Sequence, residues 1–150
     1  MGTLAMTDAE KERFLSDLHV GVIAIDDPDR APLTVPIWYD YQPGGEVTIL
    51  TGTDTVKARL LADAQRLSLC VQTETPPYQY VSVEGPVTTT RPADIERDVR
   101  PMAVRYLGER SGVAYVASLA PNLNEVRITM RPERWLSQDY TKIVTKPPPA

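Results

Sequence analysis

A β-strand ends and an amphipathic helix begins within the stretch Leu50-Thr51-Gly52-Thr53-Asp54-Thr55-Val56-Lys57-Ala58-Arg59-Leu60-Leu61. Apolar residues recur there at helical spacing and predict one buried stripe, made of Val56, Leu60, Leu61 and Ala64. The side chain of Thr53, Asp54 or Thr55 is expected to cap the helix, because each carries an oxygen that can accept a first-turn N–H. The pattern predicts a strand at 47–51, a helix at 55–64 and a further strand at 67–72.

Two cations occupy the start of this helix, where the helix dipole disfavours positive charge. Lys57 and Arg59 lie in or just after the first turn, each at a cost of roughly 0.3–1 kcal/mol. An anion at the helix N-terminus would reverse that cost, and free N–H groups, threonine hydroxyls and a lysine together favour phosphate. The alternative is a solvated helix whose two cations bind nothing. No glycine-rich phosphate loop decides between the two.

Turn residues divide the rest of the chain into strands with helices inserted between them. Strands are predicted at 20–25, 33–39, 47–51, 67–72, 78–89, 125–130 and near Trp135. Helices are predicted at 7–18, 55–64, 92–106 and 113–119. The first helix begins with a capping box, Thr7 and Glu10, and is expected to bury Phe14, Leu15 and Leu18. This order predicts a mainly β fold with α-helices, an antiparallel barrel of six or seven strands with peripheral helices.

The folded domain is expected to span 7–140. Residues 1–6 are predicted to be disordered or an addition from cloning, with Met6 as the natural start, and 141–150 to be a flexible proline-rich tail. No apolar run approaches the roughly 20 residues of a membrane helix. The chain also begins without a secretion signal, so we expect no membrane association and a cytoplasmic location.

Composition argues against several classes of chemistry. The net charge of −4 is unfavourable for nucleic-acid binding. Cys70, the only cysteine, is predicted to be a small buried residue, not a metal ligand or disulfide partner. His19, the only histidine, is predicted to be structural, which argues against zinc enzymes and Ser-His-Asp catalysis.

The predicted strand at 33–39 is apolar on both faces. Alternation directs one set of side chains toward the core, namely Leu33, Val35, Ile37 and Tyr39. The other face carries Thr34, Pro36 and Trp38, and a ligand ring, a partner subunit or the chain's own elements should cover it. In the later strand, Val81 and Val83 alternate with Tyr80, Ser82 and Glu84, a pattern found at ligand clefts, dimer seams and ordinary surfaces.

Together and in this order, these segments resemble the pyridoxamine-phosphate-oxidase-like superfamily of FMN-binding split barrels. The motifs that carry the resemblance are Val35-Pro36-Ile37-Trp38, Leu50-Thr51, Val56-Lys57-Ala58-Arg59-Leu60 and Tyr80-Val81-Ser82-Val83-Glu84-Gly85. Within the superfamily the chain is most similar to the B group of flavin- and deazaflavin-dependent oxidoreductases, over about 15–135. The resemblance implies an antiparallel split β-barrel that forms a homodimer, with the cofactor at the subunit interface.

The resemblance also implies which residues bind the cofactor. The ring would lie against Thr34, Val35 and Pro36. The phosphate would lie at Thr51, Thr55, Val56, Lys57 and Arg59, and the partner subunit would cover Trp38, Tyr78 and Tyr80. The cofactor itself would transfer a hydride to or from a small organic molecule, so no side chain is expected to be catalytic.

Departures from the family pattern bear on the choice of cofactor. Pyridoxamine-phosphate oxidases proper carry an Arg-Lys pair where this chain has Val56-Lys57. They also carry a histidine and arginines where it has Trp135-Leu136-Ser137-Gln138-Asp139-Tyr140. Oxidation of pyridoxamine phosphate is therefore not expected. Retention of Lys57 and Arg59 favours coenzyme F-420, with FMN as the alternative. A non-catalytic protein that binds a flavin or a tetrapyrrole is the third hypothesis.

Overall fold

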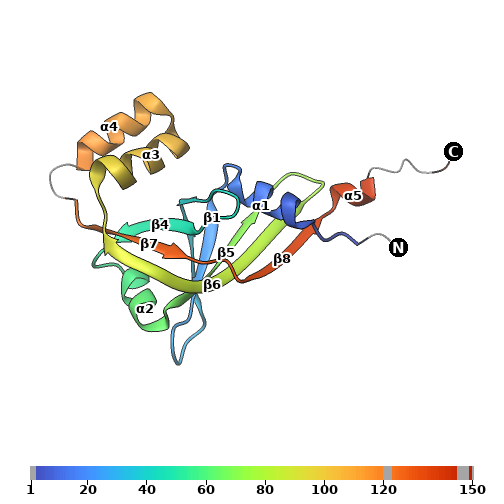
Figure 1. Cartoon of the computed structure of the whole chain (residues 1–150), viewed down its shortest axis with the longest axis horizontal. Coiled ribbons are helices and arrows are strands. Elements are labelled where there is room, and N and C mark those ends of the chain that lie inside the picture. The colour runs from blue at the N-terminus through green and yellow to red at the C-terminus, as the bar shows by residue number, and fades with distance from the viewer. Residues whose placement is uncertain (1–2, 120–122, 145–148, 150) are drawn as a thin grey trace.

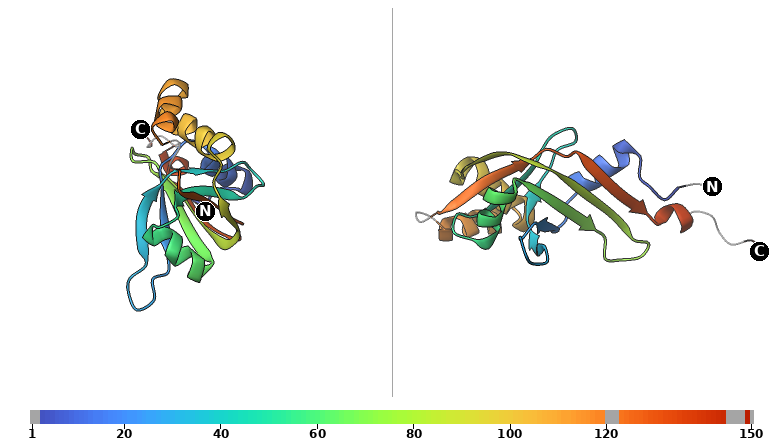
Figure 2. Two further views of the ribbon diagram at one scale, coloured as in Figure 1. Left: turned by 90° about the vertical axis from the view of Figure 1, so that its left-hand side faces the viewer. Right: turned by 90° about the horizontal axis from the view of Figure 1, so that it is seen from below.

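The computed structural model describes residues 3–119, 123–144 and 149, and its strands form one curled antiparallel sheet (Figures 1 and 2). The strands are β1 (Gly21–Ile25), β2 (Leu33–Ile37), β3 (Tyr39–Asp40), β4 (Val47–Gly52), β5 (Arg66–Gln72), β6 (Gln79–Pro92), β7 (Glu125–Met130) and β8 (Arg134–Asp139). Their order is β2-β1-β5-β6-β7-β4-β3, and β8 pairs with β6. The helices are α1 (Asp8–Ser16), α2 (Val56–Ala64), the π-helix η1 (Ile95–Val99), α3 (Arg100–Leu107), α4 (Glu109–Leu119) and α5 (Thr141–Val144). The predicted mainly β split barrel with peripheral helices is confirmed.

The long strand β6 joins the two halves of the sheet. Its first part pairs with β5 and β8, its second part pairs with β7, and the register shifts between Val87 and Thr89. At Gly85 an added Cβ would lie 1.7 Å from the carbonyl oxygen of Arg131, so only glycine fits where the link between β7 and β8 crosses β6. The sheet can therefore bend sharply enough to curl around a core.

Alternating side chains of the strands fill that core. Along β5, Leu69 and Val71 are buried, and so are Val81 and Val83 opposite them on β6. The prediction that Cys70 is buried is wrong, because its position between two inward-facing residues directs its side chain to the outer face. A second, smaller core, made of Val99, Ala103 and Val116, lies under the helices α3 and α4.

The helices α3 and α4 form a hairpin at one end of the sheet, while α1 and α5 lie at the other (Figure 1). The predicted helix at 92–106 begins later than expected, because β6 continues to Pro92 and η1 precedes α3. The Asp98 carboxylate fixes this junction, since it accepts from the Asp94 amide at 2.7 Å and pairs with Arg91 at 2.8 Å. The predicted helix at 113–119 begins at Glu109, with Gly112 inside it.

The helix caps agree with the sequence better than the buried faces do. At α1 the capping box is confirmed, since Thr7 and Glu10 exchange hydrogen bonds of 3.2 and 2.9 Å. Leu18 is 56% exposed, contrary to the prediction, because α1 ends before it at Ser16. Val56, also predicted to be buried, is 49% exposed because α2 buries only later positions of its stripe.

Trp38 divides the predicted strand at 33–39 into β2 and β3, which raises the strand count by one. Its two faces follow the prediction: Ile37 and Tyr39 are buried, while Thr34 and Pro36 are exposed.

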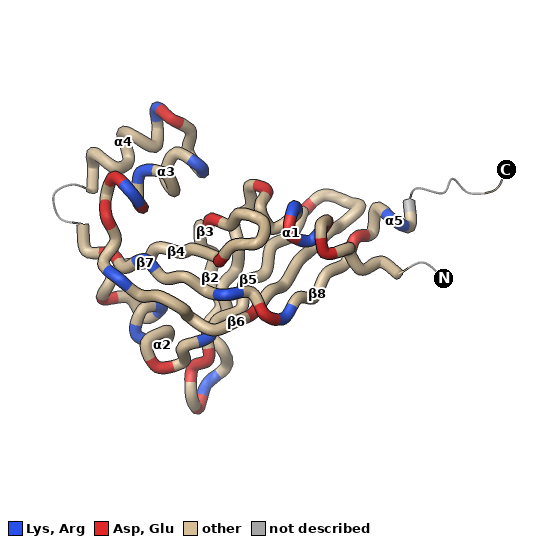
Figure 3. The backbone as a smooth tube through the Cα atoms, viewed as in Figure 1, with Lys and Arg blue, Asp and Glu red and all other residues tan. Residues whose placement is uncertain are grey.

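The ends of the described chain lie along the sheet. Although the sequence suggests disorder before Thr7, the amide of Met6 donates to Ser137 Oγ at 3.0 Å and the Met6 side chain is buried. The predicted tail at 141–150 begins with α5, whose Lys142 ammonium donates to Ala5 O at 2.9 Å. The rest of that tail, 145–148 and 150, lies outside the described residues. Lys and Arg positions are interspersed with Asp and Glu positions along the described chain (Figure 3).

Candidate functional site

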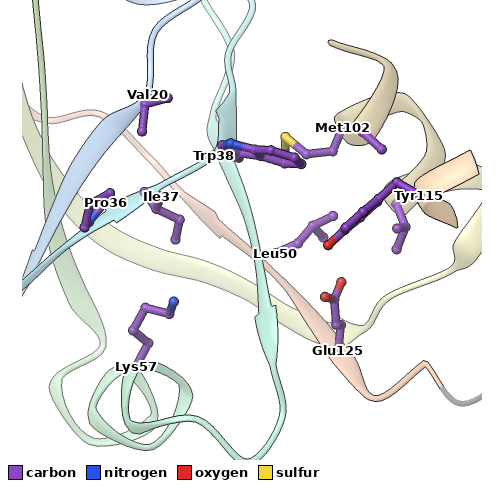
Figure 4. A pocket seen from close by; sticks show the side chains of 11 residues that line it. Val20, Pro36, Ile37, Trp38, Leu50, Lys57, Met102, Tyr115 and Glu125 are labelled. Atoms are coloured by element: carbon purple, nitrogen blue, oxygen red, sulfur yellow. The ribbon is translucent and has the colours of Figure 1, made fainter. Parts of the chain in front are cut away.

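A pocket of about 260 Å³ opens between the sheet, the start of α2 and the α3–α4 hairpin (Figure 4). Strand β2 contributes Pro36 and Ile37, and β4 contributes Leu50. The hairpin contributes Met102 from α3 and Tyr115 from α4. Helix α2 and strand β7 add one charged side chain each. The pocket is therefore mostly apolar, with a cation on one side and an anion on the other.

The cation is Lys57, whose ammonium points into the pocket (Figure 4). Within the described residues, the Lys57 side chain forms no ion pair, and the amides of Val56 and Lys57 have no acceptor. These amides are the first two of α2, where N–H groups point out of the helix and the dipole is positive. The start of α2 thus presents two N–H donors and an ammonium to an anion.

The threonines at this point serve the helix. Thr55 is the N-cap: its Oγ1 accepts from the Ala58 amide at 3.2 Å and donates to Gly52 O at 2.8 Å. The Thr51 hydroxyl, 3.0 Å from Thr55 Oγ1, must therefore donate to it. Both hydroxyl protons are engaged, so these side chains hold the helix start in place and do not offer protons to an anion.

The aromatic wall of the pocket is built by the chain itself. Trp38 stacks on Tyr106 of α3 with ring centroids 4.8 Å apart and planes inclined by 4°. The Tyr106 hydroxyl donates to His19 O at 2.6 Å, which holds its ring in place. Tyr115 lies on another side of Trp38, at 6.0 Å between centroids. A ligand ring, a partner subunit or the chain's own elements were the three predicted ways to cover Trp38. The structure shows that the chain's own helices α3 and α4 cover part of it.

The anion is Glu125, the first residue of β7. Burial raises the pKa of its carboxyl above the usual value. Among the described residues, its carboxylate forms neither a hydrogen bond nor an ion pair. A carboxylate held in this way is ready to accept a proton, a donor group or a cation.

The structure brings together only some of the residues predicted for cofactor binding. Pro36, Trp38 and Lys57 line the pocket. Thr51, Thr55 and Val56 stand at its edge and shape the start of α2.

The other predicted residues lie elsewhere in the single chain. Thr34 and Val35 precede Pro36 in β2 and do not line the pocket, and Arg59 is exposed on α2. Tyr80 pairs in register with Gln72 and Gln138 and shares their outer sheet face, while Tyr78 is exposed before β6.

The lining residues that the sequence analysis did not predict as site residues include Met102, Tyr115 and Glu125. Met102 lies within the helix predicted at 92–106, and Tyr115 and Glu125 carry no local signal of a site. A polar residue that opens a strand is common. The one available hint is that Glu125 precedes the apolar alternation of its strand.

A second groove, on the outer sheet face, adjoins the pocket. It measures about 530 Å³ and shares Val20 and Pro36 with the pocket. Val22 and Cys70 also line it. Val20 and Pro36 thus lie between the pocket and the groove.

The curled antiparallel sheet with its peripheral helices is a split barrel, and an apolar pocket lies beside the N-terminus of α2. Residues 7–139 match the profile of the pyridoxamine 5'-phosphate oxidase family, and the chain belongs to that family. A search of curated proteins finds no significant match. None of the described helices is long and apolar enough to cross a membrane.

Solved structures share the fold at low sequence identity. A conserved hypothetical protein from Mycobacterium tuberculosis is 22% identical with a TM-score of 0.75, over 100% of this chain and 95% of that one. A protein described as an F420 reductase is 21% identical with a TM-score of 0.67, over 83% and 94%. An FAD-binding protein from Mesorhizobium loti is 15% identical with a TM-score of 0.56, over 89% and 94%. At these identities the similarity is one of fold.

Proposed function

We propose that this protein is an oxidoreductase that binds coenzyme F-420 and transfers a hydride between it and a small organic molecule. The observation that carries the proposal is the start of α2, where the Lys57 ammonium and two amides without acceptors lie beside an apolar, aromatic pocket. A phosphate would bind to the ammonium and the two amides, and a flat ring would bind in the aromatic pocket. The F420 reductase among the structural neighbours supports this choice.

The residues have separate tasks in this proposal. Lys57 and the amide of Val56 hold the phosphate, and Thr55 fixes the helix that carries them. Leu50 and Met102 keep water from the ring. When bound, the cofactor supplies the hydride chemistry.

The size of the pocket bears on the quaternary structure. Ligand pockets usually measure roughly 300–1,000 Å³, and this one measures about 260 Å³, so one chain encloses only part of a coenzyme. We propose that a second copy of the chain covers the rest, with Tyr78 and Tyr80 contributing from the outer face.

A row of side chains across the outer face supports the homodimer. The sheet register aligns Pro36, Val22, Cys70, Ser82 and Leu136 on neighbouring strands. Val22 is 42% and Leu136 61% exposed, so the row is an apolar surface open to solvent.

FMN is the second candidate cofactor, because it also carries a phosphate group and a ring of similar shape. The FAD-binding neighbour favours a flavin. A yellow protein with flavin absorbance after purification supports FMN, and a colourless protein that binds added F-420 supports the first choice.

The test is the affinity of Lys57→Ala for F-420, measured by quenching of tryptophan fluorescence. We expect binding to weaken by about 1.5–3 kcal/mol, the contribution of a charge-assisted hydrogen bond, while folding is nearly unchanged. Arg30→Ala is the matched control, since it removes one exposed cation from the turn before β2, outside the pocket. Equal affinity of Lys57→Ala, Arg30→Ala and the unaltered protein would refute the phosphate site.

A further inference from the structure

Glu125 is half-buried and lines the pocket, and its carboxylate has no hydrogen-bond or ion-pair partner among the described residues. It pairs across the ladder with Gly52, which has no side chain to pack against it. Directly paired residues share one face of a sheet, and at Gly52 the methyl group of Thr55 takes the place of a side chain, since an added Cβ would lie 3.0 Å from Thr55 Cγ2. Figure 4 shows the carboxylate pointing toward the hydroxyl of Tyr115, on the opposite side of the pocket from α2.

The nearby cations of the chain are engaged elsewhere or too far away. Arg127 lies two residues along β7 on the same face, but its guanidinium pairs with Asp98 at 3.5 Å and donates to Thr48 at 3.5 Å. Lys57 lines the pocket from α2 and forms no ion pair with Glu125. The described residues therefore leave the negative charge of Glu125 without a counter-charge.

The surroundings of Glu125 suit an organic cation. Trp38 and Tyr115 present aromatic rings to the same pocket, and aromatic faces attract ammonium groups. Burial raises the pKa of Glu125, so the carboxylate is costly where it stands and gains from a bound cation. An anionic ligand group would meet the opposite charge only at Lys57.

We propose that the Glu125 side of the pocket selects a substrate that carries a positive charge next to a flat or apolar group, such as a protonated amine on an aromatic ring. Glu125 binds the cation, Trp38 and Tyr115 face it, and Lys57 keeps the anionic end of the coenzyme apart from it. The inference rests on the proposed function, because it takes the bound cation to be the substrate that exchanges a hydride with the coenzyme.

The test compares three probes of similar shape on the purified protein without added cofactor. The probes are phenethylammonium, neutral 2-phenylethanol and the anion 3-phenylpropionate, and calorimetry or tryptophan fluorescence measures their affinity. We expect phenethylammonium to bind about tenfold more tightly than the alcohol, with the anion weakest. In Glu125→Gln, which keeps the shape of the side chain, the amine and the alcohol should bind within about twofold of each other.

Lys57→Ala is the matched control for charge. It removes a repulsive cation from the same pocket, so the preference for the amine should stay or increase. Equal affinities for the amine and the alcohol in the unaltered protein, undetectable binding of the amine, or a preference that survives in Glu125→Gln would each overturn the proposal.

Titration of the same proteins with F-420 separates this inference from the proposed function. If F-420 does not bind and the preference for the amine is present, the proposal that the protein uses F-420 is refuted and the cation site remains. Binding of F-420 without that preference would refute the cation site alone.

Discussion

Replacing Gly112 with alanine sets two effects of opposite sign against each other. Gly112 lies inside α4, where alanine is intrinsically better in a helix by about 0.8–1.0 kcal/mol. An added Cβ would lie 2.8 Å from both the Cα and the N of Val104 in α3. These are backbone atoms, which cannot turn away as a side chain can. Overpacking of this kind costs about 1–3 kcal/mol, so we expect Gly112→Ala to be destabilised by about 1 kcal/mol.

The displaced hairpin should also affect the pocket. Met102 and Tyr115 stand on the two helices that Gly112 holds together, so separating the helices moves one wall. We expect weaker binding of F-420 as well as a lower urea midpoint, both measured on the same preparation.

Ser111→Ala is the matched control, because Ser111 is the exposed neighbour of Gly112 in the same helix. It should be neutral or stabilised by roughly 0.5 kcal/mol, and should bind F-420 normally. If Gly112→Ala is instead stabilised by about 1 kcal/mol, as at an uncrowded helical position, the close approach of α3 and α4 is wrong.

Two further predictions concern the acid stability and the assembly of the protein. The Thr7 amide, followed by Lys142, lowers the pKa of Glu10 from 4.5 to about 2, so its stabilisation is complete above pH 4.5 and is lost as the pH falls toward 2. Urea unfolding at several pH values should therefore show Glu10→Gln to be less stable than the unaltered protein at pH 7 and about as stable near pH 2. A difference in stability that does not change with pH would contradict the interaction of the Glu10 carboxylate with Thr7 and Lys142. If the proposed homodimer forms through the outer row, Val22→Asp should convert it to a monomer in sedimentation with little loss of stability, since Val22 is 42% exposed; a dimer that persists would contradict an interface at this row.

Local patterns in the sequence predicted the elements well. The capping box of α1 and the start of α2 follow from side chains within three residues of each other, and the faces of β2 follow from alternation. These features need no distant partner. Leu18 and Cys70 were mispredicted because an apolar residue near the end of a helix or on the outer face of a strand carries the same local pattern as a buried one.

The candidate site was less accessible to the same reasoning. Lys57 stands out because a cation in the first turn of a helix is unfavourable, and Trp38 because it lies on the outward face of its strand. Tyr115 and Glu125 violate no local preference. They enter the site only because the α3–α4 hairpin, β4 and β7 line the same pocket.

The sequence by itself determined the type and order of most elements, the family, and the unfavourable position of Lys57 in the first turn of a helix. Each of these depends on the spacing of residues that are near one another in the chain. Tertiary structure alone decided that Lys57 and Glu125 face one aromatic pocket without pairing, and that Cys70 belongs to an outer apolar row. The physical reason is distance along the chain. Charged and aromatic side chains of α2, α4, β7 and the segment after β2 come together only when the sheet curls. Local helix and strand propensities do not determine that arrangement.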